Sequence, residues 1–517
     1  MASVSSSAKA TEAVSQAAIV DWIEQLRESA KVAPSAGLLD FDGIDTIDVA
    51  LSPIYLTVLN TLRDAPPDED APAVKAVFGR ARELAYRCKV AWREMCRGWK
   101  PSLIREVDVL LWSRDLTHTV VLHPVAAELT RQGVSNCLLA CRSHIFDPLR
   151  SLNANAVFTA GAWPRVISQA RREGARRAKR LARLGAWNIP EFPSPAALWV
   201  EAAVRREIIR QLPVVAEAVA NAKTAFAKFR PKLLVVGNDI TLEGRAGCRV
   251  AAQLDVPTAT FMHGSISGDI LQTMHCVDRL LVQGDKNRQE LVQQGVDPNR
   301  IEVCGAPNLD NRPRQTGRIH ELLQAGLGIK TGDPWILVAT SGPGHRISNR
   351  HHQLVIDHLR RLSAAMPSVP VVVKLHRKDR IAHYREALQG CDSSRLLVVP
   401  DGAAGFPRDI LHWLQGCPVV LTGASTVGVE AMLMDVPVVT MDFCDEIHDV
   451  DFIDAGATIH VRTAEALESA VRETLTARRP REDVLSRVQA YLSAAFFALD
   501  GCSSNRGAKA LRAMIGV

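Results

Sequence analysis

The stretch Pro418-Val-Val-Leu-Thr-Gly-Ala-Ser-Thr-Val-Gly-Val-Glu-Ala-Met-Leu-Met-Asp-Val-Pro-Val-Val-Thr-Met441 carries the strongest fold signal in the sequence. Its apolar run at 418–421 predicts a buried strand, the small residues at 422–426 predict a turn, and 427–434 predicts a helix. A second buried strand is predicted at 436–441. Apolar runs of this length, separated by one short helix, are typical of parallel strands covered on both faces.

The turn in this stretch has the composition of a phosphate-binding turn. It lies where a strand ends and a helix begins, and free backbone N–H groups at such a point attract anions. Thr422, Ser425 and Thr426 add hydroxyl groups, and Glu430 follows in the helix, where a carboxylate could hold a ribose. An ordinary turn with a Ser or Thr cap explains the same residues. Residues at the other predicted strand ends are needed to distinguish a phosphate-binding turn from an ordinary capped turn.

Composition limits the class of protein. With 517 residues, 47% of them hydrophobic, the chain can form two or three domains of about 150 residues each. A net charge of +6 and a pI near 8.8 are too modest to indicate a nucleic-acid-binding protein. The sequence has no apolar run long enough to span a membrane. The 11 cysteines are scattered and lack CxxC spacing, which favours reduced thiols in a cytoplasmic protein and argues against zinc.

An alternating rhythm of strand and helix begins after about 100 residues. Strands are predicted in the first half at 107–112, 136–141, 232–236, 258–262, 278–282 and 301–304, and in the second half at 336–339, 369–374, 396–399, 419–421 and 438–441. We therefore expect an α/β protein with two Rossmann-like, doubly wound domains facing a cleft.

The expected domain organisation follows from this rhythm. We expect a disordered tail at 1–17, a helical region at 18–104, a first Rossmann-like domain at 105–310 with a helical insertion at 163–228, a linker at 311–332, a second Rossmann-like domain at 333–480, and C-terminal helices at 481–517.

Other strand ends supply further candidate ligands. Ser341 and Gly342 form a small turn after the strand at 336–339, and glycine there allows a phosphate to approach closely. Lys374 and His376 end the next strand two residues apart, so they point to the same side. In the first half, His263 with Gly264 follows the strand at 258–262.

In order and spacing, these motifs resemble glycosyltransferases built from two Rossmann-like domains (GT-B), in particular bacterial capsule and lipopolysaccharide polymer transferases, including Kdo- and sialic-acid-transferring enzymes and teichoic-acid glycerophosphotransferases. The resemblance covers about 105–515 and rests on His263-Gly264, the segment 282–305, Lys374-Leu-His376, the segment 425–431 and the tail segment 499–506. The sequence departs from the family pattern at Arg377, where proline is frequent, and at Cys502, where lysine is usual.

The resemblance implies transfer of a sugar from a nucleotide-sugar donor to a hydroxyl acceptor, without a metal and without a cofactor. The leaving phosphate would be stabilised by Lys374, His376, Ser425 and Thr426, with His263 as a further contributor. A general base is expected from the first domain, with Asp239 as first choice, Glu243 as second and Asp115 as third. Helix capping is the alternative role for each of these acids.

The implied partners are a nucleotide-sugar donor and a glycan or lipid-linked acceptor, with no nucleic acid. The segment 165–183 is rich in arginine, and we weigh two readings: a solvated helix, or a peripheral contact with an anionic membrane. Two rival functions remain open. One is a non-hydrolysing nucleotide-sugar 2-epimerase, which shares the fold and a similar Ser-Thr-Gly-Glu turn, and the other is a non-catalytic scaffold that binds sugar nucleotides.

Overall fold

The structure is a computed structural model of the 517-residue chain. It describes residues 15–32, 35–63, 106–140, 157–158, 164–184, 189–262, 274–310, 325–329, 333–342, 347–376, 379–389, 395–407, 409–423, 425–447, 450–477 and 482–517. Residues 1–14 of the tail predicted at 1–17, residues 64–104 of the predicted helical region and most of the linker lie outside these residues, whereas Gln16 and Ala17 already belong to the first helix.

The first domain is built on a seven-stranded parallel sheet in the order β5-β4-β3-β6-β7-β8-β9. Leucine and valine dominate its central strands, and almost every side chain of those strands is buried, because helices cover both faces. The strands are β3 (Val109–Ser113), β4 (Asn136–Ala140), β5 (Val157–Phe158), β6 (Leu233–Val236), β7 (Thr258–Phe261), β8 (Arg279–Val282) and β9 (Ile301–Val303).

Helices cover this sheet, and a long helical hairpin interrupts it. Between β5 and β6 the chain forms α8 (Pro164–Arg183) and α9 (Ala197–Phe229). The covering helices are α6 (Leu116–Arg131), α10 (Leu242–Gln253) and α11 (Asp285–Gln293), with the one-turn helices η3 (Pro298–Arg300) and η4 (Pro307–Leu309) at the end of the domain.

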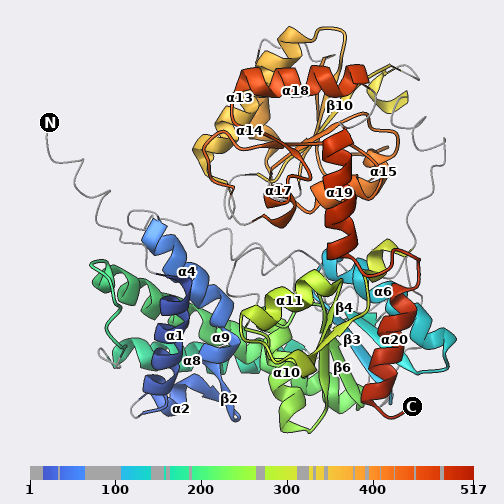
Figure 1. Ribbon diagram of the computed structural model, residues 1–517. Helices are drawn as coiled ribbons and strands as arrows, with labels where there is room; N and C mark the ends of the chain where they lie inside the picture. Colours follow the sequence, from blue (N-terminus) through green and yellow to red (C-terminus); the bar gives the residue numbers. More distant parts are fainter. Residues whose placement is uncertain are drawn as a thin grey trace, which may run out of the picture.

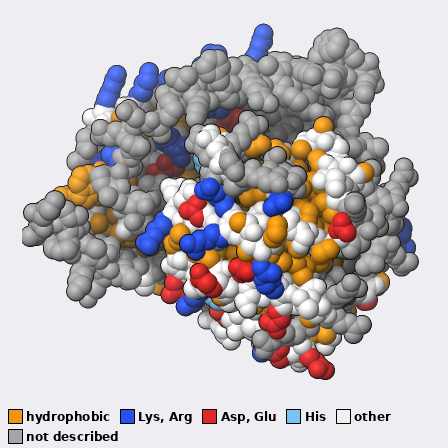
Figure 2. All heavy atoms as spheres, turned by 90° about the horizontal axis from the view of Figure 1, so that it is seen from above, with side chains coloured by type: hydrophobic (Ala, Val, Ile, Leu, Met, Phe, Trp, Pro, Cys, Tyr) orange, Lys and Arg blue, Asp and Glu red, His pale blue; other side chains and the backbone are white. Residues whose placement is uncertain are grey.

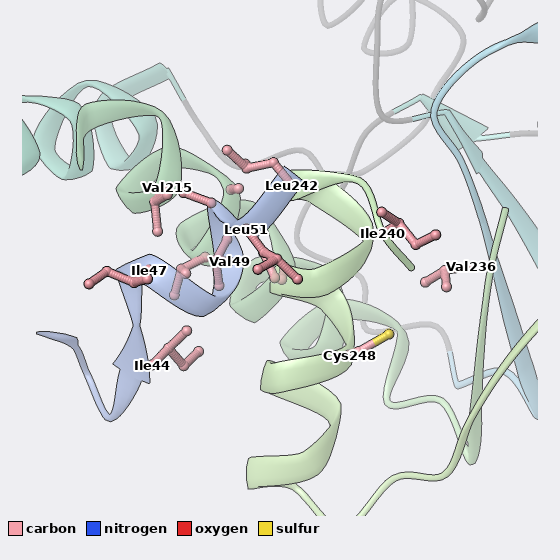
Figure 3. Close-up of a cluster of buried hydrophobic side chains, with 14 of the residues drawn as sticks. Ile44, Ile47, Val49, Leu51, Val215, Val236, Ile240, Leu242 and Cys248 are labelled. Atoms are coloured by element: carbon pink, nitrogen blue, oxygen red, sulfur yellow. The ribbon is translucent and has the colours of Figure 1, made fainter. Parts of the chain in front are cut away.

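The N-terminal helices belong to the core of the first domain. Figure 3 shows Ile47, Val49 and Leu51 lying close to Val215 of α9 and Leu242 of α10, within one buried apolar cluster. A buried ion pair fixes the same contact, because Asp48 accepts hydrogen bonds from Arg245 (2.8 Å) and Arg249 (2.6 Å). The elements are α1 (Gln16–Ala30), α2 (Ala36–Leu39), β1 (Asp40–Phe41), β2 (Ile44–Asp45), α3 (Thr46–Val49) and α4 (Leu51–Arg63).

The second domain contains a six-stranded parallel sheet in the order β12-β11-β10-β13-β14-β15. Its strands are β10 (Ile336–Ala339), β11 (Val371–Lys374), β12 (Leu396–Val399), β13 (Val420–Thr422), β14 (Val438–Met441) and β15 (Ile459–Val461). Its helices are α13 (Asn349–Ala365), α14 (Ile381–Ala387), α15 (Ile410–Leu414), α16 (Val427–Met432), α17 (Asp451–Asp454) and α18 (Ala464–Ala477).

The last two helices link the domains (Figure 1). α19 (Glu482–Ala495) packs on the second domain, where Tyr491 donates a hydrogen bond to Asp451 (3.1 Å), and its end meets the turn after β8 through Phe497 N and Gln283 O (2.8 Å). α20 (Ser503–Met514) returns to the first domain and packs beside α6. Asp310 accepts hydrogen bonds from the backbone N–H groups of Ser503 and Ser504 at the start of α20.

The predicted α/β fold with two Rossmann-like domains is confirmed. Four strands escaped prediction: β5 and β15, which are short edge strands, and the two-residue strands β1 and β2, which lie in the region predicted as helical. The helix predicted at 427–434 is shorter than expected and ends at Met432, since Asp435 adopts a left-handed conformation (φ 58°) just beyond it. Among the described residues, no helix is long and apolar enough to cross a membrane.

Candidate functional site

The stretch 418–441 lies at the topological switch point of the second sheet. β10 and β13 are neighbours in the sheet, but the chain leaves β10 toward β11 on one side and leaves β13 toward β14 on the other. The turns after these two strands therefore diverge, and ligands of open α/β sheets bind at this position. The buried hydroxyl of Thr422 donates a hydrogen bond to Ala339 O (3.1 Å) and holds the two strand ends together. Thr422 therefore has a structural role at the site. Its hydroxyl hydrogen is engaged in this bond and is not free to be donated to a ligand.

The turn after β10 is shaped for close approach. Gly342 adopts a left-handed conformation (φ 70°), and a Cβ at this position would lie 3.4 Å from Asp379. Its neighbour Ser341 is partly exposed. Thr340 accepts a hydrogen bond from the backbone N–H of His376 (3.0 Å), so the turns after β10 and β11 are joined. Four of the predicted ligands, Ser341, Gly342, His376 and Lys374, therefore come from two adjacent strand ends.

Lys374 is the last residue of β11 and points into a mostly buried environment. Its side chain is 11% exposed, and its Nζ lies 3.8 Å from Asp401 Oδ1. Burial lowers the pKa of this amine, and the carboxylates of Asp401, Asp409 and Glu430 oppose that shift. The amine is thus a cation held close to three acids at the carboxyl edge of the sheet.

Glu430, in α16, is the acid with the strongest perturbation in this group. Burial and the neighbouring charge of Asp409 raise the pKa of Glu430 to about 8, although Lys374 pulls the pKa down. Most of these carboxyl groups are therefore neutral at pH 7. A neutral acid donates a hydrogen bond and does not repel a nearby diphosphate.

Ser425 and Thr426 begin the same helix. Ser425 Oγ accepts a hydrogen bond from Val427 N at 3.4 Å, a long contact, and the Thr426 side chain is exposed and makes no capping bond. α16 has six residues, so its dipole contributes less than that of the longer helix predicted from the sequence. The hydroxyl groups of Ser425 and Thr426, rather than the helix dipole, are therefore the main groups that this turn offers to an anion.

Asp239, the predicted base, occupies the switch point of the first sheet, in the turn after β6. Its side chain is fully buried. One carboxylate oxygen lies 2.7 Å from His275 Nδ1, and the other accepts hydrogen bonds from the backbone N–H groups of Cys276 (2.6 Å) and Val277 (3.3 Å). Burial works to raise the pKa of Asp239, but His275 and these hydrogen bonds outweigh it and hold the pKa below its usual value. This geometry fits a positioning role better than proton abstraction from a substrate.

The other two first-domain acids lie nearby. Glu243 is in the first turn of α10, and its Oε2 lies 2.8 Å from Nε of Arg114, which follows β3. Asp115 caps α6 by accepting a hydrogen bond from His118 N (3.3 Å). Glu243 is 17% exposed and Asp115 is 19% exposed, so both of these acids at the switch point have access to solvent, whereas Asp239 does not.

Two further predictions concern His263 and the absence of a metal. His263 lies outside the described residues. The expectation of no metal stays a prediction: two groups of side chains, His351 with Cys444 and Glu446, and His352 with Asp379 and His383, bring their potential ligand atoms within 4.8 Å of one another. Glu446 already accepts hydrogen bonds from Ser348, and Asp379 from Tyr384, so hydrogen bonding accounts for part of both arrangements.

Sequence reasoning missed three residues that shape the site. Asp401 follows β12 closely, so the strand-end rule could have found it. Asp409 caps the short helix α15, and its influence on Glu430 depends on tertiary packing. His275 lies outside any regular element, and nothing in the local sequence signals its contact with Asp239.

Comparison with known families identifies the chain. The model of the UDP-N-acetylglucosamine 2-epimerase family matches residues 210–495, which is more than half of the sequence. No curated protein matches the chain.

Solved structures agree in fold. The chain is similar to the UDP-GlcNAc 2-epimerase of Neisseria meningitidis bound to UDP-GlcNAc, with a TM-score of 0.52 and 13% identity over 78% of this chain and 99% of that one. It is also similar to the Methanocaldococcus jannaschii epimerase in complex with UDP-GlcNAc and UDP (TM-score 0.51, 15% identity, 78% and 99% covered). A third similar structure is the S. aureus MnaA–UDP complex (TM-score 0.51, 12% identity, 79% and 97% covered).

These findings correct the predicted function. The expectation of a glycosyltransferase of the capsule or lipopolysaccharide type is wrong, although the two-domain fold it implied is right. The rival hypothesis of a nucleotide-sugar 2-epimerase is the one that the family match supports. The chain belongs to the UDP-N-acetylglucosamine 2-epimerase family.

Proposed function

We propose that this protein is a nucleotide-sugar 2-epimerase that inverts C2 of a UDP-linked N-acetylhexosamine. The observation that carries the proposal is the mostly buried amine of Lys374 beside Asp401 at the switch point of the second sheet, inside the segment matched by the epimerase family, with the raised pKa of the nearby acid Glu430 in support. A cation for the diphosphate and an uncharged acid beside it suit a bound nucleotide.

The nucleotide is proposed to bind at the strand-end turns of the second domain. Lys374 would contact the diphosphate, with hydroxyl groups of Ser425, Thr426 and Ser341 adding hydrogen bonds. Glu430, neutral at pH 7, would donate to or accept from a ribose hydroxyl. Two similar epimerases were solved with UDP-GlcNAc, which supports UDP as the nucleotide.

The chemistry requires a route to a carbon that carries no acidic proton. In the proposed reaction a base takes the C2 proton, the C–H electron pair forms a C1–C2 double bond, and UDP leaves with the C1–O pair. Return of a proton to the other face of C2 and of UDP to C1 gives the 2-epimer. Stabilising the departing diphosphate is then the main electrostatic task, and it falls to Lys374.

Glu243 is the first-domain residue that we propose as proton acceptor. Arg114 lies 2.8 Å from its carboxylate and favours the ionised form, which is the form that accepts a proton. Asp239 is proposed instead to hold the turn after β6 in place, because its carboxylate is buried and bonded on both oxygens.

A single incubation tests the proposal. UDP-GlcNAc is mixed with the protein in ²H₂O without any acceptor and followed by ¹H NMR. We expect loss of the C2 proton signal and appearance of the 2-epimer, and we expect Glu243→Gln to stop both while UDP still binds. UDP-GlcNAc that binds but shows neither exchange nor epimer would overturn the proposal, and so would release of UDP only when a hydroxyl acceptor is added.

A further inference from the structure

The helical hairpin of α8 and α9 carries two kinds of arginine. On one side of α8, Arg171 forms an ion pair with Glu217 of α9 (2.5 Å). Arg177 donates hydrogen bonds to the carbonyl groups of Gly37 and Asp40, and its guanidinium lies 4.4 Å from the ring centre of Phe41. Arg171 therefore joins the two arms of the hairpin, and Arg177 holds the hairpin to the N-terminal elements.

The other basic side chains of α8 form an exposed stripe, which we call the cationic face. Its members are spaced seven, four, three, one and three residues apart, which at about 100° per residue places them on one side of the helix. Among the described residues, one ion pair is seen on this face, between Arg176 and Glu173 (3.0 Å), and the side chain of Arg176 is still 67% exposed. The cationic face consists of Arg165, Arg172, Arg176, Lys179, Arg180 and Arg183.

Exposed apolar side chains lie at the end of the same hairpin. α8 and α9 run antiparallel, because Arg171 meets Glu217 and Gly174 packs against Pro213. The start of α9 therefore lies near the end of α8. There Leu198 is 82% exposed and Trp199 is 61% exposed. Tryptophan beside a basic helix is typical of surfaces that enter the headgroup region of a bilayer.

The second domain offers a contrast. Figure 2, which views the molecule from above, shows Lys and Arg side chains interspersed with Asp and Glu on the visible face. The cationic face of α8 has one acid within its span, Glu173, and that acid is shared with Arg177. Acids within α8 therefore balance little of its positive charge.

We propose that the cationic face of α8 and the exposed Leu198–Trp199 pair dock on a membrane surface rich in anionic phospholipids. Each basic side chain near such a surface adds about 1 kcal/mol, so removing three of them should weaken binding roughly 100-fold. The two apolar side chains would sit among the headgroups while the arginines contact phosphates. This docking is independent of the proposed epimerase activity, because none of these residues belongs to either switch point.

The test is vesicle flotation with the full-length protein. Phosphatidylcholine vesicles are compared with vesicles containing 30% phosphatidylglycerol, an amount on the order of that in anionic membranes. The expected result is binding to the anionic vesicles alone, weakened by 0.5 M salt, an ionic strength chosen to shorten the screening length to roughly 4 Å. The triple variant Arg172→Gln/Arg176→Gln/Lys179→Gln should lose about 100-fold in partitioning.

Control variants separate the loss of this surface from a general loss of charge or of stability. Arg131→Gln/Arg361→Gln/Arg472→Gln removes the same charge from exposed positions elsewhere and should bind vesicles as the parent does. Trp199→Ala should weaken vesicle binding several-fold without changing thermal stability, because the side chain is largely exposed. Equal binding to neutral vesicles, unchanged binding of the α8 triple variant, or tighter binding to a short nucleic-acid duplex than to anionic vesicles would each overturn the proposal.

Discussion

The two sheets present the same kind of switch point but fill it differently. In the first domain, the turn after β6 is closed by internal bonds: Asp239 is fully buried and bonded to His275 and two backbone N–H groups. In the second domain, Lys374 and Glu430 have perturbed pKa values and influence each other electrostatically, and the exposed Thr426 side chain makes no capping bond. Two sheets of the same topology therefore differ at their switch points. The turn after β6 is fixed by internal hydrogen bonds, whereas the turns of the second sheet are suited to a ligand.

The largest effect on stability is expected from disrupting the buried turn after β6 in the first domain. Asp239→Ala removes the carboxylate and leaves His275 and two buried N–H groups without their partner. We expect a loss of about 3–5 kcal/mol in the free energy of unfolding. Urea denaturation measures it, and Asp115→Ala, which removes a helix cap and a 3.8 Å contact with His118 Nδ1, should cost about 1 kcal/mol. Equal losses in the two variants would contradict the special status of Asp239.

The next effect concerns the cation of the ligand side. Lys374→Met should raise the Kd for UDP by roughly 30- to 100-fold, because a charge-assisted contact contributes about 2–3 kcal/mol. Stability should change little, since burial already disfavours the charged amine. Isothermal titration calorimetry measures the affinity. A Kd within threefold of the parent would show that the diphosphate binds elsewhere.

A smaller effect depends on pH. Glu430 has a raised pKa of about 8, so the carboxyl group is neutral below that pH and becomes an anion above it. The anion repels a diphosphate, so UDP affinity of the parent protein should fall as the pH rises from 7 to 9. Glu430→Gln stays neutral throughout. The ratio of the two Kd values should therefore change about tenfold over this range, whereas a constant ratio would argue against the assigned pKa.

The same ionisation has a consequence for stability. Because the folded-state pKa of Glu430 lies above the usual value of 4.5, the folded state binds this proton more tightly than the unfolded state does. Stability should therefore be lost as the pH rises toward and through about 8, and Glu430→Gln should lose less. Thermal unfolding at pH 6 and pH 9 compares the two proteins, and parallel curves would contradict the buried acid.

The smallest effect separates two neighbouring threonines. Thr422→Val removes a buried hydrogen bond to Ala339 O and should cost about 1 kcal/mol of stability. Thr426→Val alters an exposed side chain without a capping bond and should leave stability unchanged. In UDP binding the order should reverse, with Thr426→Val the weaker binder. Titration of both variants with UDP checks this reversal.

Much of the fold could be predicted because buried parallel strands have an unmistakable composition. Runs such as Leu-Leu-Val-Val at 233–236 are apolar on both faces, as parallel strands covered by helices require. β15 escaped because only one of its three residues is fully buried, so it has no apolar run to detect.

The site was only partly predictable. The strand-end rule leads to Lys374, Ser425 and Asp239, because chain direction fixes where parallel strands end. It cannot reveal which of these residues is locked, since the partner of Asp239 lies 36 residues further along the chain. Nor can it separate a transferase from an epimerase, because both need a cationic site for a nucleotide diphosphate. A match along the whole segment 210–495 was required for that.

The most direct test of the contrast between the two switch points is a crystal structure of the protein with UDP. We predict that the diphosphate binds at the turns after β10, β11 and β13, with an oxygen about 3 Å from Lys374 Nζ. We also predict an unchanged Asp239–His275 contact. A diphosphate bound instead at the turns after β3 and β6, beside Arg114, would contradict the account.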